Sequence, residues 1–351
     1  MKYLYAFLSL VILAISLFLL IPGPVDSVAY NPPPAPALTG VLAPNHDLER
    51  AERLARGLIH GPEDVDVDGE GRIYGGTGDG RIVRIATDGT AKTFAETGGR
   101  PLGLHFDARG NLIVCDAWKG LLSIDPRGEI TTLSTQADGV PFRLTNDLDI
   151  NARGIIYFTD ASSKFHRPEH KLDLIEARPH GRLLSYDPQT GKTRVLLRDL
   201  YFANGVALSQ NQDFVLVNES GRYRTLRYWL KGEKAGSHEV FIDNLPGFPD
   251  GISGNRRGTF WLALIAPRKA IVDRLHPKPF LKNLLAKLPE SLLPKPQPYG
   301  LVLALDEQGE ITRSLHDPSG GWVPGITSVE ERGGYLYLGN LEQDWVGRLK
   351  L

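Results

Sequence analysis

The sequence predicts an all-β fold, a six-bladed β-propeller spanning residues 41–351, from a repeat and from its turn chemistry. From residue 60 onward one unit recurs six times: a polar or turn residue, a short apolar strand, a turn with Gly or Asp, and a second apolar strand. Apolar residues alternate with period two between closely spaced turns, as in all-β proteins. Repeats roughly 40 residues apart are typical of propeller blades, and the leucine-rich or hexapeptide pattern of a solenoid is missing.

The six copies differ mainly in length. Wider spacing within the third and fifth copies indicates insertions there. The copies read PEDVDVDGEGRIYGGT, PLGLHFDARGNLIVCD, TNDLDINARGIIYFTD, ANGVALSQNQDFVLVNE, PDGISGNRRGTFWLAL and ITSVEERGGYLYLGN.

Residues 1–22 precede the repeats and form a candidate transmembrane segment. Residues 3–21 are uncharged and mostly apolar, which is long enough for a spanning helix. Ser27-Val28-Ala29 could instead end a cleaved secretory signal, although the apolar part of a signal is usually shorter. We expect a single N-terminal anchor with Lys2 inside and the propeller on the extracytoplasmic (periplasmic or lumenal) side. Cleavage would give a secreted protein. The Pro-rich residues 23–40 form a linker to the propeller.

The fifth copy carries a basic insertion at residues 267–298, with seven Lys or Arg against two acidic residues. It has apolar residues at helical spacing, namely Phe280, Leu281, Leu284, Leu285 and Leu288. Three structures fit this pattern: a lid over the channel, a helix on an anionic membrane surface, or an ordinary helix packed on the propeller.

Four polar residues hold the same position at the start of the first strand of their copies. Glu63, Asn146 and Asp250 lie eight residues before the turn Gly, and Asn204 matches them in a unit one residue longer. Equivalent positions in a propeller converge around the central channel. Asn and Asp at strand starts are often turn-formers. Glu is not, and an unpaired buried carboxylate is costly, so two carboxylates and two amides favour a Ca²⁺ site over a Zn²⁺ site.

The same residues resemble a known family. LTNDLDI, FANGVALS and NLPGFPDGI, within residues 40–351, are similar to the six-bladed calcium propellers that include strictosidine synthase-like proteins, gluconolactonases and paraoxonases, above all to the adipocyte membrane-associated branch. The resemblance implies a channel Ca²⁺ held by the residues matching Glu63, Asn146, Asn204 and Asp250. It also implies a second, structural ion at Asp64 and Asp147, and hydrolysis of lactones or aryl esters.

Two positions depart from that family's catalytic patterns. Leu102 stands where paraoxonases have a catalytic His, and Thr327 falls near the catalytic Glu of strictosidine synthases. Neither a His dyad nor the strictosidine synthase condensation is therefore expected.

We expect a calcium-dependent hydrolase of small-molecule esters or lactones, of arylesterase or lactonase type. The ion would polarise the substrate carbonyl, and Asp250 would be the general base or nucleophile. The alternative is a non-catalytic, membrane-anchored propeller that binds a partner. Its contact residues would be Phe202, Phe248, Trp261 and Trp322. The net charge of −1 gives no indication of a nucleic-acid partner.

Overall fold

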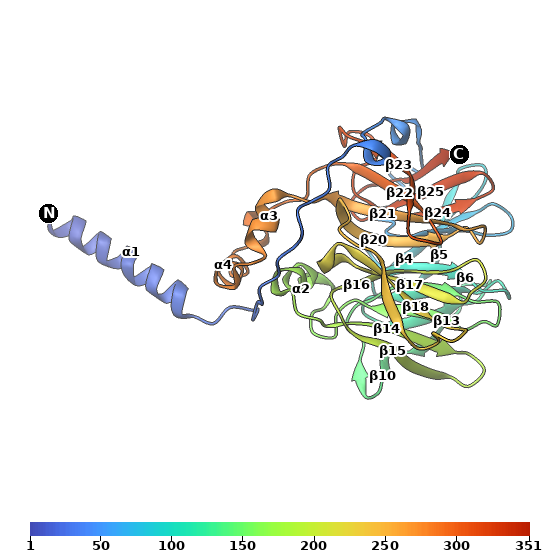
Figure 1. Ribbon diagram of the computed structural model, residues 1–351, viewed down its shortest axis with the longest axis horizontal. Helices are drawn as coiled ribbons and strands as arrows, with labels where there is room; N and C mark the ends of the chain where they lie inside the picture. Colours follow the sequence, from blue (N-terminus) through green and yellow to red (C-terminus); the bar gives the residue numbers. More distant parts are fainter.

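The computed structural model describes the backbone of residues 1–351 and every side chain other than those of Ile12, Ala14 and Ile15. Six four-stranded antiparallel sheets form the blades of a propeller, which confirms the predicted fold (Figure 1). The innermost strands contact one another in a closed ring that runs β2, β6, β12, β16, β20, β24 and back to β2.

Each blade is a meander whose strands run outward from the channel. The first five blades comprise β2–β5 (Val65–Val67, Ile73–Gly76, Arg81–Ile85, Ala91–Glu96), β6–β9 (Pro101–Phe106, Leu112–Asp116, Gly120–Ile124, Ile130–Ser134), β12–β15 (Thr145–Ile150, Ile156–Asp160, Gly181–Asp187, Lys192–Leu200), β16–β19 (Ala203–Leu208, Phe214–Glu219, Arg224–Trp229, His238–Ile242) and β20–β23 (Gly247–Gly254, Thr259–Pro267, Gly300–Asp306, Ile311–Asp317). A hairpin of β10 (Gln136–Ala137) and β11 (Val140–Pro141) joins the second blade to the third.

The sixth blade joins the two ends of the propeller chain. It consists of β24 (Ile326–Arg332), β25 (Tyr335–Asn340) and β26 (Val346–Lys350), and β1 (Glu52–Leu54) pairs with β26 as its outermost strand. Leu48, in the short 3₁₀ turn Asp47–Arg50 before β1, is fully buried in the core shared by the fifth and sixth blades. The N-terminal segment thus closes the ring.

Burial follows position within the blade. The second strands β7 (LIVCD) and β17 (FVLVNE) are buried throughout, because both of their faces pack against neighbouring blades. The outermost strands β5 and β9 alternate or are largely exposed. Continuous apolar runs in the second strand of each repeat are therefore what this fold requires.

Two insertions cover the face of the propeller where the innermost strands begin. α2 (His170–Glu176) lies between β13 and β14, and α3 (Ala270–Leu275) and α4 (Pro279–Leu285) lie between β21 and β22. The N-terminal helix α1 (Lys2–Leu20), long and apolar enough to cross a membrane, extends away from this same face (Figure 1). Below, α2, α3, α4 and residues 286–298 are called the lid.

Replacing Leu48 should destabilise the propeller because the residue closes the ring from within the core. Leu48→Ala is expected to cost about 2–5 kcal/mol of unfolding free energy, whereas Leu58→Ala, at a side chain 56% exposed, should be almost neutral. Thermal unfolding of the full chain in detergent measures both variants. Equal melting temperatures would show that the N-terminal segment does not contribute to closure.

Candidate metal centre

The structure brings together the four residues that the repeat aligned. Glu63, Asn146, Asn204 and Asp250 are each 5% exposed, and all four line one cavity at the mouth of the central channel. Asn204 Nδ2 donates a hydrogen bond of 2.6 Å to Asp250 Oδ1. Residues from four different blades therefore line one cavity, and two of them are in direct contact.

Neighbouring blades fix the backbone at three of these positions. Thr327 Oγ1 donates to the Glu63 carbonyl (2.5 Å), Thr159 Oγ1 to the Asn204 carbonyl (2.8 Å) and Asn218 Nδ2 to the Asp250 carbonyl (2.6 Å). Sequence reasoning missed the supporting roles of these residues. A signal was present for Thr159 and Asn218: apolar second strands end in a polar pair, as in IIYFTD and FVLVNE.

Gly205 lets two of the site's strands approach each other. A Cβ at this position would lie 2.4 Å from the Asp250 carbonyl oxygen and 2.5 Å from the backbone N of Ile252. Real Cβ atoms do not come that close to backbone, so only glycine permits this packing of β16 against β20. The glycine after Asn204 is thus what places Asn204 beside Asp250.

The two amide side chains leave their oxygens free. Asn204 uses its NH₂ group on Asp250 Oδ1 and on Ser220 Oγ (3.2 Å), which turns its oxygen away from those partners. Both Asn146 Oδ1 and Asn204 Oδ1 are buried without a hydrogen-bond partner among the described residues. Buried acceptors are normally satisfied, so two unpaired ones beside two carboxylates indicate a place for a cation.

The electrostatics of the site agree with that assignment. Burial and the neighbouring Asp250, Asp64 and Asp147 raise the pKa of Glu63 well above its usual range, and burial raises the pKa of Asp250 to about 7. The guanidinium of Arg167, which lines the cavity, acts against the rise at Asp250. Two carboxylates in one buried site repel each other, and a divalent cation would remove that repulsion.

The donor set fits calcium better than a transition metal. It consists of oxygens alone, two of them charged and two neutral, which hard cations prefer. Among residues with described side chains, no group of three or more His, Cys, Asp and Glu is arranged to hold a metal. The four residues present are thus able to hold a Ca²⁺ ion, with cavity space left on one side.

The cavity above the four residues has a volume of about 430 Å³ and is mostly apolar. Leu102, Leu144, Phe202 and Phe248 belong to its walls. The lid covers it, with Leu174 and Ile175 from α2, Val272 and Leu275 from α3, and Leu285 from α4 among the lining residues. The basic insertion at residues 267–298 therefore forms part of the cavity.

Asp64 and Asp147 lie deeper in the channel and connect neighbouring blades. Asp64 Oδ2 accepts the backbone N–H of Leu104 (2.9 Å), and Asp147 Oδ2 accepts that of Val206 (2.8 Å). Both line a second, smaller cavity of about 140 Å³. These bonds give the two carboxylates a structural role, and a second ion between them remains a prediction.

The aromatic residues considered for a binding module do not share one surface. Phe202 and Phe248 line the cavity, Trp261 is buried in the core of the fifth and sixth blades, and Trp322 stacks with its ring centroid 3.9 Å from the Arg53 guanidinium. An aromatic recognition groove built from all four is therefore not formed.

Comparison with known proteins identifies the family of this chain. The family model "Strictosidine synthase" matches residues 146–233, and "Strictosidine synthase-like, N-terminal" matches residues 40–85. The adipocyte plasma membrane-associated protein of Bos taurus is 38% identical over 95% of this chain and 86% of its own length. Protein STRICTOSIDINE SYNTHASE-LIKE 4 of Arabidopsis thaliana is also 38% identical, over 93% and 88%. The chain belongs to the strictosidine synthase-like family.

Solved structures share the fold of this family member at low sequence identity. A gluconolactonase from Xanthomonas campestris superposes with a TM-score of 0.64 at 17% identity, covering 95% of this chain and 99% of its own. Regucalcin from Agrobacterium tumefaciens, a calcium-binding protein, gives 0.61 at 15% identity, covering 85% and 92%. The apolar helix α1 indicates membrane association, and the relatives named plasma membrane-associated are consistent with it.

Calcium should stabilise the protein, and more so at higher pH. The folded-state pKa values of Glu63 and Asp250 lie above the unfolded values of about 4, so without a cation these groups lower stability as pH rises toward 7. Added calcium offsets this cost and competes with protons below pH 7. The expected result is a larger calcium-induced rise in melting temperature at about pH 8 than at about pH 5.5. A rise that is absent, or equal at both pH values, would contradict the site.

Gly205→Ala should weaken calcium binding without altering any of the four proposed ligands. The new methyl group must push β16 away from Asp250 by disturbing backbone, so Asn204 loses its place. A fall in affinity of at least about tenfold is expected by calorimetry with the full chain. Gly69→Ala is the matched control because a methyl group added there would meet open space, with no contact within 4 Å. Unchanged affinity in Gly205→Ala would refute the packing argument.

Proposed function

We propose that this protein is a calcium-dependent hydrolase of esters or lactones. The observation that carries the proposal is the pair of unpartnered, buried amide oxygens of Asn146 and Asn204, placed beside Glu63 and Asp250 at the bottom of a cavity. A purely structural ion would need no adjoining cavity, whereas a catalytic ion needs an open position. The fold shared with a gluconolactonase and with calcium-binding regucalcin supports the same conclusion.

A calcium ion bound at these residues would polarise the substrate carbonyl and stabilise the negative charge that develops on its oxygen. Glu63 and the two amide oxygens orient the site from three blades. The apolar walls formed by Leu102, Leu144, Phe202 and Phe248 bind the body of the substrate and exclude bulk water.

Asp250 is the residue that we assign as general base. One of its oxygens, Oδ1, is engaged by Asn204 Nδ2, and the side chain lines the cavity. Oδ2 is then the atom that takes a proton from an attacking water, while Asn204 keeps the carboxylate oriented. Leu102, 2% exposed in the cavity wall, supplies no base where paraoxonases have a His, so Asp250 has to act without one.

The anchor bears on which side of the membrane the active site would lie. We propose that α1 holds the protein in a membrane by its N-terminus, with the propeller on the extracytoplasmic side, because the only charged residue of the segment, Lys2, stays inside.

Hydrolysis of a panel of phenyl esters and lactones by the full chain tests the function. Wild type with calcium should be active, chelation should abolish turnover, and Asp250→Asn should lower kcat by about 10²–10⁴-fold, the usual contribution of a general base. Asp88→Asn, at an exposed turn carboxylate far from the cavity, is the matched control and should keep full activity.

Two results would overturn the proposal in different ways. Calcium binding without turnover on any substrate would leave a metal-stabilised binding module. Activity that resists both chelation and Asp250→Asn would place the chemistry elsewhere in the molecule.

A further inference from the structure

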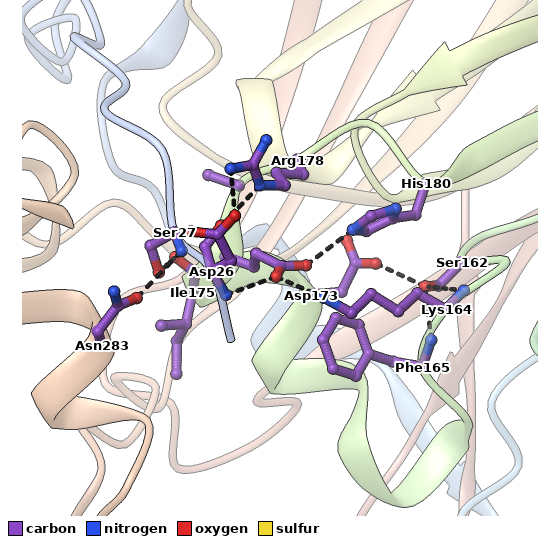
Figure 2. A network of polar contacts seen from close by, with 12 residues as sticks. Asp26, Ser27, Ser162, Lys164, Phe165, Asp173, Ile175, Arg178, His180 and Asn283 are labelled. Atoms are coloured by element: carbon purple, nitrogen blue, oxygen red, sulfur yellow. Dashed lines mark hydrogen bonds and ion pairs between the residues drawn. The ribbon is translucent and has the colours of Figure 1, made fainter. Parts of the chain in front are cut away.

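The lid is tied to the membrane anchor by a very short stretch of chain. α1 ends at Leu20, and the backbone N–H of Asp26 already donates to Glu176 Oε1 of α2 (2.7 Å). The next residue, Ser27, donates its N–H to Asn283 Oδ1 of α4 (3.0 Å; Figure 2). A fully extended chain covers at most about 3.6 Å per residue, so six residues reach roughly 20 Å. The lid therefore lies within that distance of the end of α1.

The attachment of this linker to the lid is extensive. Glu176, which is fully buried, also binds Lys164 Nζ (2.5 Å) and His180 Nε2 (2.7 Å), so the acceptor for Asp26 is itself held in place. Arg178 Nη2 pairs with Asp26 Oδ2 at 2.6 Å. Lys282 Nζ, buried in α4, donates to the Val28 carbonyl (2.8 Å). The linker is thus bound to both α2 and α4.

A direct contact joins the lid to α1 itself. Lys287 Nζ, just after α4, donates to the Phe18 carbonyl in the last turn of α1 (2.7 Å). α1 leaves the molecule on the lid side of the propeller (Figure 1). The bilayer that α1 enters therefore faces the lid.

The outer surface of the lid has the composition of a membrane-binding surface. Phe280 and Leu292 are 65% and 64% exposed, and Ile271 and Leu281 are exposed beside them. Exposed basic residues accompany them at Arg274, Lys278 and Lys295. Large apolar side chains fixed in water are unfavourable, and aromatic and aliphatic residues flanked by Lys and Arg are typical of interfacial helices.

The same helices that present this surface also cover the cavity. On α3, Ile271 is exposed while Val272 and Leu275 line the cavity, and on α4, Phe280 and Leu281 are exposed while Leu285 lines it. Only one layer of short helices separates the cavity from the surface that faces the bilayer.

We propose that the outer surface of the lid docks on the membrane that α1 enters, and that the cavity receives amphiphilic esters or lactones that partition into that membrane. The docking depends on the linker length and the exposed residues alone. The substrate class rests on the proposed hydrolase function.

Depth-dependent quenching tests the docking directly. The full chain is placed in nanodiscs containing lipids with a quencher in the acyl chains, and a fluorophore is attached at Phe280→Cys or, as control, at Gln189→Cys. Gln189 is exposed in the turn between β14 and β15, on the opposite face of the propeller, and the native Cys115 is fully buried and protected from labelling. Strong quenching at 280 and none at 189 is expected. No quenching at 280 would overturn the docking and leave a protein partner as the occupant of this surface.

Hydrolysis in the same nanodiscs tests the substrate class. Phe280→Asp with Leu281→Asp should lower kcat/KM for a long-chain ester dissolved in the bilayer by on the order of tenfold, and leave a short water-soluble ester unaffected. Val240→Asp, at an exposed apolar residue of β19 outside the lid, is the matched control. Equal losses on both esters would overturn delivery from the membrane. Quenching at 280 without hydrolysis of either ester would overturn the hydrolase function while the docking stands.

Discussion

The structure at the centre of this propeller depends on two buried carboxylates, whose negative charges are unfavourable so close together unless a cation or protons neutralise them. Glu63 and Asp250 are buried in one cavity, where loss of hydration raises the pKa of both, and the charge of Asp250 raises that of Glu63 further. The two amide oxygens beside them find no donor in the described part of the chain. Apolar side chains at these positions would be at least as stable, so the arrangement favours the proposed cation site over a purely structural role.

The site is formed by equivalent positions of the six repeats, and the repeats differ in which of these positions are polar. Six equivalent strand starts converge on the channel, and at Leu102 and Ile326 that position is apolar and buried. The remaining four supply oxygens. Gly205 lets β16 come within contact of Asp250, and carbonyl-binding side chains such as Asn218 set the height of the backbone. The geometry of the proposed ligands is thus determined by contacts between blades, including the hydrogen bond that Asn204 donates to Asp250.

Contacts between blades are the part of the site that the sequence alone does not predict. The blades, their order and the four converging residues follow from a repeat whose register is visible in one chain, because equivalent residues must lie at equivalent heights. The closing strand β1 has no repeat partner in sequence, and its pairing with β26 is a long-range contact that no local pattern encodes. Likewise, the free orientation of the Asn204 oxygen depends on Ser220 and Asp250, which the sequence does not place beside it.

The lid makes the two faces of the propeller different. Turns between second and third strands are short in most blades, and the third and fifth blades extend them into α-helices, both over the face where the four oxygens lie. Residues 23–30 bind to these helices before they join the propeller, so the anchor and the cavity roof form one unit. In the proposed arrangement, a cavity roof fixed this close to a bilayer would expose the cavity to bilayer-dissolved substrates at a higher local concentration than to water-dissolved ones. The apolar cavity walls and the apolar outer surface of the lid would then both suit substrates that dissolve in the membrane.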